Sequence, residues 1–128
     1  MSPGRVPVAE TATTPFDTDL VETVARERAV SVDDLRAALD RHQSTVRENL
    51  GADSLVYEWR RYHPGDPLVA RTVEWYVCAV RPAIWAEFET ALDIDLAAVR
   101  AVHDRQARRL VADERPFEDH AAMVLVRG

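Results

Sequence analysis

The spacing of the apolar residues changes at Gly51, and this change limits the folds that the chain can adopt. Before Gly51, apolar residues recur every three or four positions, which is typical of amphipathic helices. After it, large apolar and aromatic residues alternate with other residues over 54–62, and a run rich in valine, threonine and aromatic residues covers 69–80. Both of these patterns are typical of β-strands.

The segment between the two strand-like runs favours a turn. Residues 63–67 read His-Pro-Gly-Asp-Pro, and proline, glycine and aspartate are the residues that turns select. Two β-like runs on either side of such a turn predict a β-hairpin. The alternation along the second run predicts that Val73, Trp75 and Val77 are buried on one face of the sheet. Glu74 is then expected to be exposed.

Helices are predicted on the N-terminal side of the hairpin. Apolar residues indicate a helix over 18–29, and Ser31 is a typical N-cap for a second helix over 32–50. The second segment has two interpretations. One continuous amphipathic helix fits its apolar spacing, and so do two helices that are separated near Asp40.

Two further helices are predicted on the C-terminal side. Pro82 suits the first turn of a helix, and Asp93 or Asp95 can cap a last one that runs to about Leu110. The apolar run 123–126 is a candidate edge strand. We therefore predict an α+β protein with a flexible tail over 1–16, one domain over 17–111 and a C-terminal extension over 112–128.

Composition indicates a soluble, acidic, cytoplasmic protein. The chain of 128 residues is 47% hydrophobic and has a formal net charge of -6. All 16 basic residues are arginine, a composition that looks like that of a halophile with a GC-rich genome, although codon bias alone gives the same pattern. No signal peptide or membrane-spanning segment is expected. The single cysteine, Cys78, lies in an apolar run and is expected in the core.

The segment from Ser31 to Leu50 resembles the helix-turn-helix of winged-helix transcription regulators. Apolar residues of the stretch 31–39 fall where that motif buries them, Ser44 and Thr45 would cap a recognition helix, and a β-hairpin follows as a wing does. The resemblance covers about residues 18–80. It departs from the motif at Asp40 and Arg41, where a glycine and an apolar residue are usual.

The resemblance implies binding to double-stranded DNA and transcription regulation. Base edges would be contacted by Gln43, Ser44, Thr45 and Arg47, and phosphates by Arg41, Arg60, Arg61 and Arg71. Residues 41–71 hold five arginines and four acidic residues, a local excess of one positive charge. The alternative is an ordinary amphipathic helix with solvated arginines.

No motif for catalysis, a metal or a cofactor is present in the sequence. The four histidines (His42, His63, His103 and His120) are far apart and form no zinc-binding pattern. His42 lies on an apolar stripe and is expected to be partly buried and hydrogen-bonded. There is no glycine-rich phosphate loop and no nucleophile elbow. We therefore predict a binding protein that is not an enzyme.

Aromatic residues gather around the predicted hairpin and offer a second functional hypothesis. Their expected role is core packing, but on an exposed face they would promote a homodimer or another protein contact. The group is Tyr57, Trp59, Tyr62, Trp75, Tyr76, Trp85 and Phe88.

Residues 54–110 are also similar to a small family of halophile proteins, on the stretches 57–61, 66–69, 82–88 and 103–109. That resemblance implies no activity.

Overall fold

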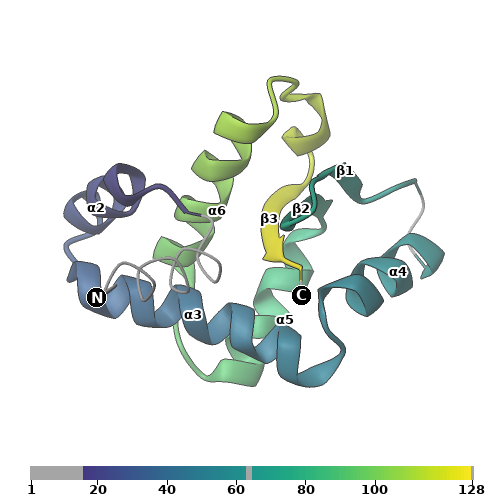
Figure 1. Cartoon of the computed structure of the whole chain (residues 1–128). Helices are drawn as coiled ribbons and strands as arrows, with labels where there is room; N and C mark the ends of the chain where they lie inside the picture. The colour runs from purple at the N-terminus through teal and green to yellow at the C-terminus, as the bar shows by residue number, and fades with distance from the viewer. Residues whose placement is uncertain (1–15, 63–64, 128) are drawn as a thin grey trace, which may run out of the picture.

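The protein has an α+β fold, as the sequence predicts (Figure 1). The computed structural model describes residues 16–62 and 65–127. The helices are α2 (Thr18–Glu27), α3 (Val32–Asn49), α4 (Ala52–Tyr62), α5 (Pro82–Leu92), α6 (Ala97–Leu110) and the short 3-10 helix η1 (Arg115–Phe117). The strands are β1 (Leu68–Arg71), β2 (Trp75–Val80) and β3 (Ala121–Val126). Most of the predicted N-terminal tail lies outside the described residues, but its last residue, Phe16, is buried.

Residues 32–49 form one uninterrupted helix, so the two-helix interpretation is wrong. The Ser31 hydroxyl accepts a hydrogen bond of 3.0 Å from the Asp34 amide and caps the first turn. No turn forms near Asp40, because the next residues continue the buried stripe of the helix rather than interrupt it. That stripe is Leu35, Leu39, His42, Gln43 and Val46. The helix ends at Asn49, and Gly51, two residues further on, has a φ of +81° that suits a residue without a side chain.

Residues 54–62 lie in helix α4, so the first strand of the predicted hairpin is wrong. Ala52, Val56 and Trp59 are four and three positions apart and are buried together on one side of the helix. Tyr57, which the alternating pattern placed beside Trp59, is exposed on another side. The apolar residues of this short segment fit both periods, and packing of the helical stripe stabilises α4.

A hairpin does form, but inside the second predicted run, between β1 and β2. The Thr72 hydroxyl accepts hydrogen bonds of 3.1 Å from the amides of Glu74 and Trp75, which closes a tight turn. Val73 lies at the tip of this turn and is 90% exposed, so its predicted burial is wrong. The prediction holds for Val77, which is fully buried, and Trp75 is half-buried.

The three strands form an antiparallel sheet in the order β1-β2-β3. β3, which comes from the C-terminal part of the chain, pairs with β2 along its whole length, from Trp75 opposite Val126 to Val80 opposite Ala121. Cys78 on β2 is buried, as predicted. Helix α6 runs beside β3, and α2 packs on α6 at the far side from the sheet, so that α4 lies at the opposite end of the molecule from α2 (Figure 1).

Candidate functional site

The predicted DNA-contacting residues of α3 do not form one surface. Gln43 is buried and therefore cannot contact a base. Ser44 and Thr45 lie within α3, near its C-terminal end, instead of capping a new helix. Arg41 donates a hydrogen bond of 3.3 Å to the Leu92 carbonyl, whereas Arg47 donates one of 3.0 Å to the Ser44 hydroxyl. The geometry of a helix-turn-helix is therefore missing from this segment.

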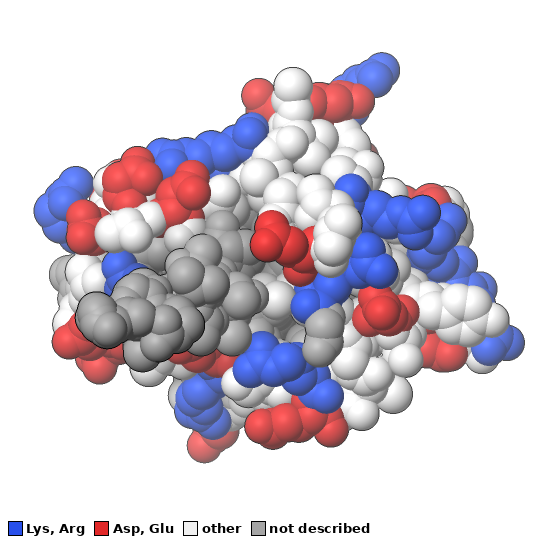
Figure 2. All heavy atoms as spheres, viewed as in Figure 1, with Lys and Arg blue, Asp and Glu red and all other residues white. Residues whose placement is uncertain are grey.

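The other predicted arginines lie on α4 and β1. Arg60 forms an ion pair of 3.0 Å with Asp66, and Arg61 a longer one of 3.8 Å with Glu58. Arg71 is exposed at the end of β1. Figure 2 shows basic side chains over the end of the molecule that holds α4 and the hairpin, with acidic side chains among them. On the face in view, this end therefore carries mixed charge.

The outer edge of β3 is closed by side chains from three helices. The Gln43 amide donates to the Val124 carbonyl at 2.8 Å and accepts from the Val126 amide at 3.0 Å. His103 of α6 accepts from the Val124 amide at 2.9 Å, and the Trp85 indole donates to the Ala122 carbonyl at 3.2 Å. An open strand edge invites pairing with another chain, so these bonds make β3 unsuitable for that contact.

Two histidines lie side by side within the core. The rings of His42 and His103 are edge to face with 5.1 Å between their centroids, and His42 stacks on Trp85 at 4.9 Å. His42 is fully buried and neither ring nitrogen has a hydrogen-bond partner in the described part of the chain, so its expected hydrogen bond is missing. Burial lowers the pKa of His42 to about 4, and burial followed by the charge of His42 lowers that of His103 well below its usual value. Both rings are therefore neutral at pH 7.

A reactive thiol and a metal site are the next two kinds of functional site to consider. Burial, helped by the charge of Asp66, raises the pKa of the Cys78 thiol to about 12, so it is not a nucleophile at neutral pH. Residues 16–62 and 65–127 contain no group of three or more metal-ligating side chains. None of the helices in these residues is long and apolar enough to cross a membrane.

The exposed side of α4 carries aromatic and charged side chains together. We use the name α4 face for Tyr57, Glu58, Arg61 and Tyr62. The two tyrosines are 61% and 68% exposed, so both rings present apolar area to solvent. The Arg61 guanidinium lies 5.7 Å from the ring centroid of Tyr57 and 5.0 Å from that of Tyr62, which holds the three side chains together as a group.

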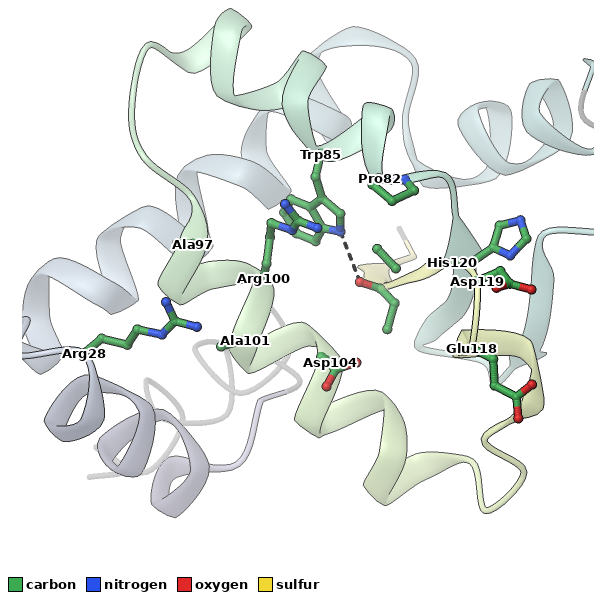
Figure 3. Close-up of a pocket in the computed structure, with 12 residues that line it drawn as sticks. Arg28, Pro82, Trp85, Ala97, Arg100, Ala101, Asp104, Glu118, Asp119 and His120 are labelled. Carbon is green, nitrogen blue, oxygen red and sulfur yellow. Dashed lines mark hydrogen bonds between the residues drawn. The ribbon is translucent and has the colours of Figure 1, made fainter.

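A groove of about 500 Å³ lies between α5, α6 and the start of β3 (Figure 3). It is hollow because the residues that face one another across it are small. Ala97 and Ala101 are one turn apart on α6, opposite Ala121 and Ala122 of β3. Pro82 and Trp85 of α5 close one end. We call this hollow the α6–β3 groove.

Charged residues lie around the rim of the α6–β3 groove. Arg28, Arg100 and Asp104 lie on the α6 side, whereas the side chains of Glu118, Asp119 and His120, on the other side, point away from the hollow (Figure 3). Apart from His120, which belongs to the four histidines considered as zinc ligands, none of these residues is singled out by a motif in the sequence, although the spacing of Ala97, Arg100, Ala101 and Asp104 signals one helical side with small and charged residues. The residues of β3 that face α6 across the groove, Ala121 and Ala122, are about twenty positions further along the chain, so no local pattern in the sequence reveals the groove.

Comparison with family models gives a match over residues 14–127, nearly the whole chain. The model describes a domain of unknown function, DUF8048. The chain belongs to the DUF8048 family. The matched residues include helices α2 to α6 and all three strands of the sheet. Comparison with curated proteins and with solved structures finds no match.

Proposed function

We propose that this DUF8048 protein is a non-enzymatic protein-interaction module that forms a homodimer through the α4 face. The observation that carries the proposal is the exposure of Tyr57 and Tyr62 on either side of Arg61. Tyrosine and arginine are enriched at the centres of protein interfaces, because they bury apolar area and still offer hydrogen bonds. Neither tyrosine contributes to the hydrophobic core of its own chain.

The charges on the α4 face favour a second copy of the chain as the partner. Glu58 and Arg61 are three positions apart and only 3.8 Å from each other, with side chains 41% and 51% exposed. In a two-fold interface, if one residue of the first copy contacts a second residue of the other copy, the reverse contact forms as well. Antiparallel α4 helices would therefore pair Glu58 of each chain with Arg61 of the other. The same face is thus complementary to itself.

The edges of the sheet offer less to a partner. Side chains already occupy the free backbone groups of β3 at Val124 and Val126. The other edge, β1, has only four residues and an irregular register between Leu68 and Ala70. Short and irregular edges are a common protection against strand pairing. The α4 face is therefore the better candidate surface.

Sedimentation velocity over a range of protein concentrations tests the proposal. One helix pair buries less than the roughly 800 Å² per partner of a standard interface, so we expect a dissociation constant of about 10 μM or weaker. Replacing Tyr57 and Tyr62 together by serine should leave only monomer. The matched control is Val30→Ser, which changes an exposed apolar residue between α2 and α3. Equal association of both variants would overturn the proposal.

A charge exchange tests the antiparallel arrangement itself. Glu58→Arg and Arg61→Glu should each weaken self-association roughly tenfold, because like charges then meet across the interface. An equimolar mixture of the two variants should associate again, since every contact then joins opposite charges. An ion pair that acts only within one chain predicts no recovery on mixing.

The competing hypothesis, DNA binding, has a distinct result. Fluorescence anisotropy with duplex DNA would then rise with protein concentration and fall steeply with added salt, because phosphate contacts release counterions. We expect no such signal for this protein. Salt-dependent duplex binding that Arg60→Gln and Arg61→Gln remove would overturn the interaction-module proposal.

A further inference from the structure

Helix α4 lies at the margin of the core. Each of α2, α3, α5 and α6 contributes at least one side chain that is completely buried, for example Val24 of α2 and Trp85 of α5. In α4 the most buried residues, Ala52 and Val56, keep an exposed fraction of 4%. Figure 1 shows α4 at one end of the molecule. Elements with few deeply buried contacts are the first to open in a folded protein.

A glycine separates α4 from the helix before it. Gly51 has a φ of +81°, a backbone conformation that a continuous α-helix does not contain, so α3 and α4 are two helical units joined at this residue. Apart from its chain neighbours, no atom of the described residues lies within 4 Å of the position that a Cβ would take there. Joints of this kind absorb changes of φ and ψ when one element moves against another.

Arg127, which follows β3, connects the hairpin to the first turn of α4 (Figure 1). Its backbone N–H donates to the Glu74 carbonyl and its guanidinium to the Thr72 carbonyl, both at 2.8 Å. The guanidinium lies 4.7 Å from the ring centroid of Tyr76, and its Nε lies 3.4 Å from the Asp53 carboxylate of α4. Because the hairpin already holds this guanidinium, its contact with Asp53 costs little further side-chain entropy.

The two ends of α4 are attached to the fold in different ways. At the first turn, the Asp53 carboxylate also accepts a hydrogen bond from the Tyr76 hydroxyl of β2. At the other end, Arg60 forms an ion pair of 3.0 Å with Asp66, in which both side chains are about half exposed. Exposed pairs of mobile side chains contribute little to stability, whereas the Arg127 side chain is only 30% exposed. We therefore expect the stronger polar attachment at Asp53.

We propose that α4 opens from the rest of the fold as a unit about Gly51, and that Arg127 is the latch that holds it closed through Asp53. Opening would expose Val56 and Trp59, the apolar side of α4 that the closed form buries. The latch thus sets how often this second side of the helix meets solvent. It is separate from the α4 face and does not depend on dimer formation.

Hydrogen exchange of the backbone amides in the intact chain tests the latch. Arg127→Gln should speed the exchange of the α4 amides of residues 55–62 about tenfold and leave that of the Val124 amide in β3 unchanged. The matched control is Arg60→Gln, which removes the ion pair at the other end of α4 and should change the same amides by less than about threefold. An equal effect of the two variants, or a rise at Val124 as large as that in α4, would overturn the proposal.

A double-mutant cycle assigns the effect to one contact. Asp53→Asn removes the charge that attracts Arg127 but keeps an oxygen that can accept from Tyr76. Alone it should speed the exchange of the α4 amides, and together with Arg127→Gln it should add little, because both changes break the same contact. Additive effects would show that Arg127 does not act through Asp53 and would overturn the latch. The chain with Tyr57→Ser and Tyr62→Ser should respond to Arg127→Gln as the unmodified chain does, so that failure of the dimer proposal is distinguishable.

Discussion

The side-chain amide of Gln43 pairs with the backbone of Val124 as a neighbouring strand would. It donates to the Val124 carbonyl at 2.8 Å and accepts from the amide two residues further along β3 at 3.0 Å. All of these atoms lie in buried residues. One glutamine on a helix thus satisfies backbone groups that no strand reaches.

Removing this amide should destabilise the protein. Gln43→Ala leaves a buried carbonyl and a buried N–H without partners, which should lower the free energy of unfolding by about 2 to 5 kcal/mol. Urea denaturation followed by tryptophan fluorescence measures the change. Ser44→Ala, at the adjacent position, should change it by less than about 1 kcal/mol. A loss below about 1 kcal/mol for Gln43→Ala would mean that water replaces the amide.

Stability should fall in mild acid because of the two core histidines. Burial lowers the pKa of both in the folded state, to about 4 for His42, so the unfolded chain binds more protons below pH 6.5. The stabilisation is fully present above pH 6.5 and is lost as the pH falls toward the folded pKa. For His42 this amounts to about 3 kcal/mol by pH 4.

Urea denaturation between pH 7.5 and pH 4.5 measures this dependence. His42→Phe keeps an aromatic ring against Trp85 but removes the titrating group. The free energy of unfolding of the variant should therefore depend less steeply on pH, by an amount equivalent to the uptake of about one proton on unfolding. The control is Val30→Ser, which changes an exposed residue that does not titrate and should leave the slope unchanged. Identical slopes for His42→Phe and the unmodified chain would contradict the assignment.

Cys78 should be unreactive in the folded protein. Its thiol is fully buried on β2, and burial raises its pKa to about 12, so almost no thiolate is present at pH 8. Labelling with iodoacetamide should proceed only as fast as the protein unfolds. In denaturing urea the thiol should react at the rate of a free cysteine. Rapid labelling without denaturant would show that β2 opens locally.

One alanine occupies a backbone conformation that favours glycine. Ala29 follows α2 with a φ of +56°, a left-handed geometry that costs a residue with a side chain about 1 kcal/mol. Ala29→Gly should therefore raise the free energy of unfolding by about 1 kcal/mol. The matched change Ala37→Gly, inside α3 at an exposed position, should lower it by a similar amount. Thermal denaturation of both variants measures whether the free energy of unfolding rises in the first and falls in the second.

Several elements follow from local patterns in the sequence. Pro82 begins α5, Ser31 caps α3, and Cys78 is buried in an apolar strand. Each of these depends on residues within a few positions of each other, so capping, backbone restriction and apolar periodicity are sufficient to predict them. The α+β class follows from the same short-range information.

Segment 54–62 shows where local information ends. Leu55, Tyr57 and Trp59 fit the period of a strand, whereas Val56 and Trp59 fit one side of a helix with Ala52. Both arrangements bury Trp59, and only the surroundings distinguish them. The hydroxyl of Tyr76 bonds to Asp53 in the first turn of α4, a contact between positions 23 residues apart. Tertiary packing thus overrides a β-like local pattern.

The sequence alone determined the helical spacing, the Ser31 cap and the α+β class of this protein, because these depend on interactions between near neighbours. The cap predicted at Asp93 or Asp95 is wrong, since Leu96 is the N-cap of α6. Only the tertiary structure decided which polar residues are buried and which charges meet. Gln43 closes β3 because α3 passes an edge 81 residues away along the chain. Arg28 follows α2, Arg100 lies on α6 and Asp119 precedes β3, so they border one groove only after these three elements have packed. Packing of distant segments is set by the burial of their apolar sides, and the positions of the polar groups follow from it.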